Sequence, residues 1–306
     1  MSGPVSARGG WNYTCCVLLV GLFASAASGC GAPRLAPAKG QLRIISLAPS
    51  VTETLFALGA GAEVVGVSQY CDYPPQVRRL PRIGTFLTPN VEQIVALRPT
   101  LVIGLLTSSD LREIRALQAM GIESLMVHDG SVTAIEESIQ KIGDVIARPN
   151  AARKLAAQIR SRINNVEEQL RTVQPRRVLM VVGHQPIVAV GPGTYLDDLL
   201  TLAHARNIAS PSMQSWPRLS LEYIIISRPE VILDGQMGAD SRAPNGFWGK
   251  YQSIPAVRKQ WVFGYPDDPT LHPGPRIAQT LELLARLIHP QAFATDEHKP
   301  AHRTAS

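Results

Sequence analysis

Two segments of this chain, 130 positions apart, carry nearly the same pattern of residues. Residues 90–99 read Asn-Val-Glu-Gln-Ile-Val-Ala-Leu-Arg-Pro, and residues 220–229 read Ser-Leu-Glu-Tyr-Ile-Ile-Ile-Ser-Arg-Pro. Each begins with a polar residue suited to cap a helix, continues with apolar positions at helical spacing, and leads into an apolar strand. Because this period is far longer than that of a solenoid, the pattern indicates a duplicated domain.

Strands and helices alternate around both copies. In the first half we expect strands at 43–47, 64–67, 101–103 and 125–127, with helices at 52–58, 91–97, 111–120 and 135–146. In the second half we expect strands at 177–182 and 231–233, with helices at 195–202, within 220–229, and at 275–288. This alternation predicts parallel sheets covered by helices on both faces.

The segment between the halves interrupts the alternation. After Pro149 it runs to Val173 without Gly or Pro, and an apolar stripe recurs every three or four residues, at Leu155, Ile159, Ile163, Val166 and Leu170. A helix of about 23 residues would be about 35 Å long. We therefore predict an α/β protein of two Rossmann-like lobes, each with a parallel central sheet, bridged by one long α-helix. The predicted parts are a signal peptide at 1–29, a lipidated tether at 30–41, an N-terminal lobe at 42–148, a bridging helix at 149–174, a C-terminal lobe at 175–290 and a polar tail at 291–306.

The N-terminus has the composition of an export signal. Arg8 is the only charged residue before position 34, and residues 15–24 form an apolar run about as long as a signal-peptide core and too short to span a bilayer. Small residues then lead to Cys30, which resembles the lipidated cysteine of a bacterial lipobox, although Ala27 stands where Leu is usual. We expect lipidation at Cys30; the alternative is an ordinary signal peptide cleaved nearby. Only Cys71 would then remain, so no internal disulfide is expected, and Cys71 is interpreted as a small packed residue.

Composition narrows the function classes. Of the 306 residues, 45% are hydrophobic and 18% charged, which excludes a disordered chain. The net charge is +6 but the basic residues are scattered, so a nucleic-acid-binding arm is not expected. The chain lacks a Rossmann glycine fingerprint, a P-loop, a nucleophile elbow and a paired-cysteine motif. An enzyme is therefore not expected.

Several motifs together resemble the cobalamin and ferric-siderophore solute-binding proteins of bacterial ABC importers, over nearly all of residues 42–290. The motifs are Arg-Ile-Ile-Ser-Leu-Ala-Pro-Ser-Val-Thr-Glu-Thr-Leu-Phe-Ala-Leu-Gly from position 43, Gly-Val-Ser-Gln-Tyr-Cys-Asp-Tyr-Pro-Pro from 66, Pro-Asn-Val-Glu from 89, Trp-Pro-Arg-Leu-Ser-Leu-Glu from 216 and Pro-Gly-Pro-Arg from 273. The resemblance implies two lobes bridged by a long helix. It also implies capture of cobalamin, a related corrinoid or a ferric siderophore as transported ligand, without an intrinsic cofactor, and delivery to a permease dimer with its ATPase subunits. Localisation would be periplasmic or at the cell surface, anchored to the membrane through Cys30.

The resemblance also assigns site residues. Glu92 and Glu222 match the acidic residues with which each lobe docks onto the permease, and both lie in the first turn of their helices, where an acid also favours the helix dipole. Tyr70, Phe86, Trp216 and Asp268 match ligand-binding positions, while Leu105 departs from a cobalamin-binding member that carries Trp there. Arg98 and Arg228, which precede the prolines, are interpreted as structural, with stems that cover apolar surface near each helix end.

Other solutes remain open, and because the resembled family carries tetrapyrrole-like ligands, a chelatase-like activity on a tetrapyrrole is the one enzymatic alternative. Siderophore-binding members often use arginines, for which the candidates are Arg82, Arg218 and Arg242, although all three could be surface residues. Three histidines in loops or after strands, His128, His184 and His272, leave a zinc-binding lipoprotein as a rival, and His184 or His272 could contact haem iron; polar packing is the simpler interpretation. Trp248 could lie in the core or at a cleft rim, and the sequence does not decide between them.

Overall fold

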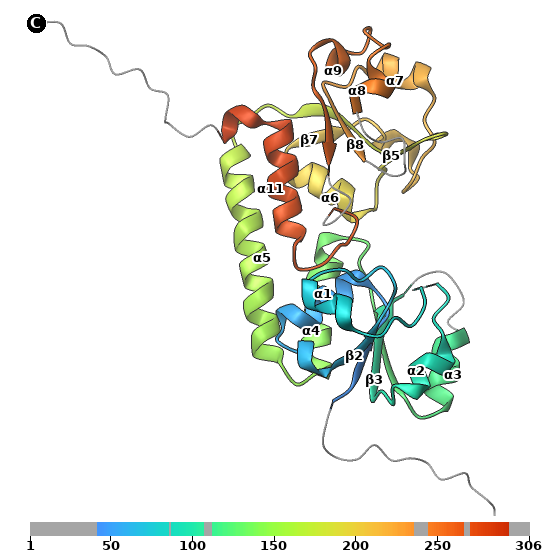
Figure 1. Ribbon diagram of the computed structural model, residues 1–306. Helices are drawn as coiled ribbons and strands as arrows, with labels where there is room; N and C mark the ends of the chain where they lie inside the picture. Colours follow the sequence, from blue (N-terminus) through green and yellow to red (C-terminus); the bar gives the residue numbers. More distant parts are fainter. Residues whose placement is uncertain (1–41, 86, 107–111, 236–243, 266–269, 294–306) are drawn as a thin grey trace, which may run out of the picture. The chain divides into compact units, whose positions relative to one another are not determined.

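The strands form two separate sheets, one from each half of the sequence (Figure 1). The structure is a computed structural model that describes residues 42–85, 87–106, 112–235, 244–265 and 270–293. The N-terminal sheet has the order β2-β1-β3-β4, and every pair in it is parallel. Its strands are β1 (Ile44–Ser46), β2 (Val64–Val67), β3 (Leu101–Leu105) and β4 (Glu123–Val127).

The C-terminal sheet has the order β6-β5-β8-β9, and β7 also pairs with β5. The pairs β5–β7, β5–β8 and β8–β9 are parallel, whereas β6 folds back on β5 as an antiparallel hairpin. The strands are β5 (Arg176–His184), β6 (Ile187–Ala189), β7 (Ala205–Asn207), β8 (Val231–Gly235) and β9 (Val262–Tyr265). The predicted α/β class with a parallel central sheet in each half is confirmed, with one antiparallel edge strand added.

Helices follow most of the strands, as the alternation predicts. They are α1 (Pro49–Ala57), α2 (Val91–Ala96), α3 (Arg112–Ala119), α4 (Val132–Val145), α5 (Pro149–Leu170), α6 (Tyr195–Leu202), α7 (Leu221–Ser227), α8 (Pro244–Trp248), α9 (Pro255–Arg258) and α11 (Ile277–Ile288). Short 3₁₀ turns are η1 (Gly61–Glu63), η2 (Pro75–Arg79), η3 (Ser210–Ser212) and η4 (Pro290–Ala292). Helix α1 begins three residues before the expected position because Pro49, which lacks an N–H, is well suited to a first helical turn.

The long helix α5 confirms the expected connection between the halves but ends at Leu170 rather than at 174. Residues 171–173 form a turn, and Gln174 cannot readily continue the helix because a residue directly before a proline disfavours the helical backbone. Four residues of the predicted stripe are buried, and Ala152 and Ala156 complete it; Leu155 is only partly buried. A side chain at Gly143 of α4 would overlap the Cβ of Ala152, so this glycine permits the close approach of α4 and α5.

Helices α5 and α11 run side by side (Figure 1). One continuous apolar core joins the stripe of α5 to α4, α11 and both sheets, and the described residues all belong to one compact unit. The predicted lobe boundaries at 148 and 174 therefore stay predictions. In the part of the chain that the structure describes, no helix is both long and apolar enough to cross a membrane.

Candidate functional site

The two duplicated segments fold as helices with the same N-terminal cap. The side-chain oxygen of Asn90 accepts a hydrogen bond from the N–H of Gln93 at 3.0 Å, at the start of α2. The Ser220 hydroxyl accepts one from the N–H of Tyr223 at 3.2 Å, at the start of α7. Both predicted caps are confirmed, and each supplies a partner to an N–H that the helix itself leaves unpaired.

The C-terminal ends of these helices also match. Arg98 and Arg228 adopt left-handed backbone conformations, with φ of 48° and 51°. The carbonyl of Arg98 accepts from Nε of Arg43 at 3.1 Å, and that of Arg228 accepts from Nε of Arg177 at 3.0 Å. Arg98 and Arg228 are exposed, and their backbones form the turn that ends each helix. Cover of apolar surface by their stems stays a prediction. The sequence reasoning missed Arg43 and Arg177; their place at the start of the first strand of each half was the available signal.

Glu92 and Glu222 are exposed in the first turn of these helices. The pKa of Glu222 lies below its ordinary value because its own backbone N–H and the Ser220 hydroxyl donate to the carboxylate. Large apolar side chains stand beside both acids: Ile226 is 78% exposed, and Val95 is 39% exposed. Positions three and four apart share a helix face, so each acid has an exposed apolar neighbour.

Two of the predicted ligand-binding aromatics are described and both are exposed, Tyr70 by 48% and Trp216 by 47%. Tyr70 lies in a turn after β2. The backbone N–H of the preceding residue, Gln69, donates a hydrogen bond to the carbonyl of Gly84 and anchors this turn. Trp216 lies in a segment that runs along β6, where the N–H of Ala189 bonds the carbonyl of Pro217 at 2.9 Å. Each sheet thus holds one aromatic face on a backbone-anchored loop. Phe86 and Asp268 lie outside the described residues, as does Cys30; Leu105 ends β3 and is partly buried.

The arginine candidates for an anionic chelate differ in their surroundings. Arg82 donates to the carbonyls of Ser68 and Cys71 and pairs with Asp72 at 3.3 Å, so its guanidinium holds the loop after β2. Arg218 is exposed, and Arg242 lies outside the described residues. Cys71 is fully buried, and burial raises its thiol pKa, which confirms its interpretation as a packed residue.

The histidine candidates do not gather into a metal site among the described residues, where no group of three or more His, Cys, Asp or Glu side chains converges. His128 is exposed after β4, and His272 is partly buried before α11. His184, at the end of β5, lies with Nε2 2.9 Å from both carboxylate oxygens of Asp234.

Asp234 also accepts a hydrogen bond from the indole Nε1–H of Trp248 at 2.8 Å. Trp248 is fully buried, so it is a core residue, and Phe247 stacks on the His184 ring with centroids 4.3 Å apart. Burial raises the pKa of Asp234, while its two hydrogen-bond partners act against that rise. The sequence did not signal this cluster, because His184 and Asp234 lie 50 residues apart.

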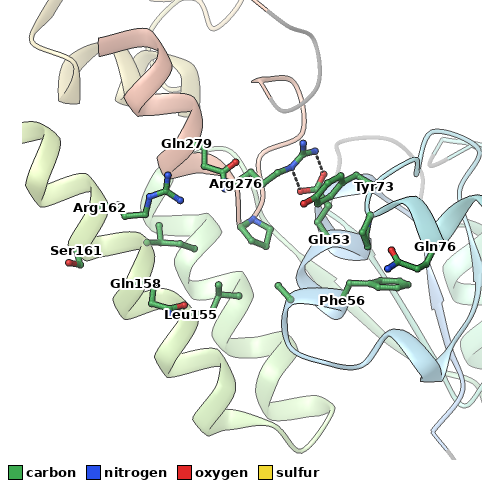
Figure 2. Close-up of a pocket in the computed structure, with 14 residues that line it drawn as sticks. Glu53, Phe56, Tyr73, Gln76, Leu155, Gln158, Ser161, Arg162, Arg276 and Gln279 are labelled. Carbon is green, nitrogen blue, oxygen red and sulfur yellow. Dashed lines mark hydrogen bonds and ion pairs between the residues drawn. The ribbon is translucent and has the colours of Figure 1, made fainter. Parts of the chain in front are cut away.

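A cavity of about 780 Å³ lies among α1, the turn before η2, the middle of α5 and the start of α11 (Figure 2). Across it, Arg276 holds Glu53 by two hydrogen bonds of 2.7 and 2.5 Å, and its guanidinium lies 4.1 Å from the ring centroid of Tyr73. Tyr70 and Trp216 are not among its lining residues, so this cavity does not include the two predicted ligand-binding aromatics that the structure describes.

Comparison with known proteins places these features in context. Residues 44–269 match the periplasmic binding protein family. The vitamin B12-binding protein of Photorhabdus laumondii is 29% identical over 248 residues, which cover 81% of this chain and 88% of that protein. The vitamin B12-binding protein of Vibrio cholerae is 30% identical over 241 residues, which cover 78% of this chain and 86% of that protein.

Two solved structures are similar in fold over the same region. The apo periplasmic haem-binding protein of Roseiflexus sp. RS-1 has a TM-score of 0.74 and 30% identity, covering 83% of this chain and 100% of that chain. The periplasmic vitamin B12-binding protein of Vibrio cholerae has a TM-score of 0.72 and 29% identity, covering 82% of this chain and 98% of that chain.

Proposed function

The chain belongs to the periplasmic binding protein family, and on that premise we propose that it is the substrate-binding protein of an ABC importer for cobalamin or a related corrinoid. The observation that carries the proposal is the similarity, along about four fifths of the chain, to proteins named for vitamin B12 binding. The relatives are binding proteins, and we infer that this chain too binds its solute without transforming it.

The exposed aromatics supply a surface suited to a corrin. Tyr70 and Trp216 come from loops of different sheets, and each is about half exposed. Aromatic faces pack against flat, largely apolar rings, while the Tyr hydroxyl and the Trp N–H remain available to polar substituents. In this proposal the solute lies between one aromatic face from each half, and Phe86 and Asp268 complete the site.

The duplicated helices supply the delivery surface. Glu92 and Glu222 occupy equivalent positions on α2 and α7, which share both their N-terminal caps and their left-handed ends. A permease built as a symmetric dimer offers two equivalent contact sites, and two linked contacts strengthen each other through effective concentration. Val95 and Ile226 would add apolar contact beside each acid. Import would be driven by the permease's ATPase subunits.

Contacts between the two halves would limit how far the halves move relative to each other when the solute binds. The Glu53–Arg276 pair joins α1 to the start of α11, and Asp198 of α6 accepts a hydrogen bond from the N–H of Val132, at the start of α4, at 2.9 Å. With α5 as a continuous connection, these contacts restrict hinge opening. Family membership implies an exported, periplasmic protein; anchoring through a lipid on Cys30 is our further proposal.

Haem is the second candidate solute. The similar structure from Roseiflexus is named as haem-binding, and Leu105 stands where a cobalamin-binding member carries Trp. Haem and corrin are both flat macrocycles, so the same aromatic faces suit either. Titration of the protein with cyanocobalamin and with haem separates the two.

Delivery is tested by reversing both acidic charges. The Glu92→Arg/Glu222→Arg double variant should bind cyanocobalamin with unchanged affinity by calorimetry and lose cobalamin uptake in cells that depend on this protein. The matched control is Glu123→Arg/Glu167→Arg, which makes the same charge change at exposed acids elsewhere and should transport normally. Normal uptake by the first double variant, or its loss of cobalamin affinity, would contradict the docking role.

A further inference from the structure

A cavity of about 780 Å³ lies beside α5. None of the residues that line it is assigned to solute capture or to docking in the proposed function. Its walls come from segments far apart in sequence, since Glu53 of α1 and Arg276 before α11 are separated by 223 positions. Figure 2 shows side chains from α1, the turn at 73–76, α5 and the start of α11 around the same space. The volume is large enough for a small organic molecule, because ligand pockets are typically about 300–1,000 Å³.

The charged side chains of this lining already form ion pairs within the protein. Arg276 and Glu53 form a two-pronged pair, and their side chains are only 12% and 2% exposed. Arg162 forms a second such pair with Glu282, at 2.8 and 2.7 Å. A charged ligand would have to compete with a bidentate partner that is already in place, which favours a neutral ligand.

The rest of the lining offers ring faces and amides. The rings of Phe56 and Tyr73 border the cavity, and Tyr73 is 44% exposed. Three glutamine side chains, Gln76, Gln158 and Gln279, come from three different walls (Figure 2). All three glutamines are exposed, and within the described part of the chain none of their amides has a hydrogen-bond partner, so each can donate to and accept from a ligand in exchange for water.

We propose that this cavity is a second binding site, for a small neutral solute that combines a flat ring with hydrogen-bonding groups. The ring packs on Phe56 or Tyr73, and the polar groups bond the glutamine amides. Because α1, α5 and α11 all contribute to the walls, bound solute would favour the present arrangement of these helices. The site does not include Tyr70 or Trp216, so binding in this cavity does not depend on which solute those two residues capture.

The test uses the protein from residue 31 onward and the neutral naphthyl ketone dye prodan, whose ring and carbonyl fit this description. Prodan emission should shift to the blue and saturate at one dye per protein, and Trp216→Ala should not change this. Gln158→Trp fills the cavity and should weaken prodan binding at least about tenfold, as expected for loss of about 1.4 kcal/mol or more. Gln279→Ala, which removes one amide without filling the space, should weaken it about threefold.

The matched control is Asn164→Trp, which places the same ring on α5 at a position that is also exposed but does not line the cavity, and which should bind prodan normally. Circular dichroism of each variant should match that of the parent. The proposal is overturned if prodan does not bind, if Gln158→Trp binds it normally, or if Trp216→Ala abolishes binding. It is also overturned if the anionic dye anilinonaphthalene sulfonate binds the cavity more tightly than prodan.

Discussion

At the scale of single residues, Asp234 shows how a buried acid can be held by its neighbours. It is 2% exposed at the end of β8, between the indole N–H of Trp248 and the imidazole of His184. Burying a carboxyl group is unfavourable unless its oxygens are hydrogen-bonded, and both of these are. The cluster therefore fixes the end of β5 and helix α8 to β8.

Replacing Asp234 should destabilise the protein by an amount that depends on the replacement. Asp234→Leu leaves the buried N–H of Trp248 without an acceptor and should lower the free energy of unfolding by about 1–3 kcal/mol. Asp234→Asn keeps a carbonyl oxygen that can accept from the indole, so its loss should be smaller. Urea denaturation measures both variants. Equal losses of unfolding free energy in the two variants would show that the hydrogen-bond acceptor for Trp248 does not contribute to stability.

At the scale of secondary-structure elements, the ends of α2 and α7 carry backbone strain at matching residues. Arg98 and Arg228 have φ near 50°, where a Cβ is unfavourable and glycine is not. Glycine is the common residue at such helix ends, so its absence in both copies hides these turns from sequence reasoning.

Glycine at either position should relieve this strain. Arg98→Gly and Arg228→Gly should each be more stable than the corresponding alanine variant by about 1 kcal/mol. The alanine variants are the proper reference because they also lack the guanidinium but keep the Cβ. Thermal and urea unfolding give the comparison, and alanine variants as stable as the glycine variants would rule out strain at these residues.

The ion pair between Glu53 and Arg276 joins α1 to the start of α11. Because both side chains are nearly buried, Glu53→Gln should lower the free energy of unfolding by about 3–5 kcal/mol. The exposed pair of Glu137 and Lys141, at 3.7 Å on α4, provides the control, and Glu137→Gln should cost about 0.3–0.5 kcal/mol. Similar losses for the two variants would mean that the buried pair contributes little.

Elements differ in how far the sequence predicts them. The caps Asn90 and Ser220 and the stripe of α5 follow from local patterns, and the structure confirms them. The elements absent from the prediction are β6, β7, β9, α8 and α9, each of five residues or fewer and so too short to show a period. The equally short β1 and β2 were predicted because each is an apolar run next to a helical pattern.

At the scale of the whole molecule, the fold class was predictable because the duplicated segment and the long helix leave few arrangements open. The family was predictable because several of its motifs stand together in the chain. The candidate sites were only partly predictable. Equivalent positions in the two halves, together with the family resemblance, make Glu92 and Glu222 candidates, and their docking role stays a prediction. In contrast, the Glu53–Arg276 pair and the His184–Asp234 cluster join residues that are distant in sequence, and nothing local marks such partners.

The measurement that tests the central claim most directly is a titration of residues 31–306 with cyanocobalamin, haem and ferric siderophores, followed by tryptophan fluorescence and calorimetry. The account predicts sub-micromolar binding of cyanocobalamin, on the scale of about −8 kcal/mol or stronger. Trp216→Ala should weaken it at least about tenfold, because one aromatic face is lost, while the stability of the variant stays close to that of the parent. Tight binding of haem alone would identify the second candidate as the solute. Binding of none of these solutes would contradict the proposed function.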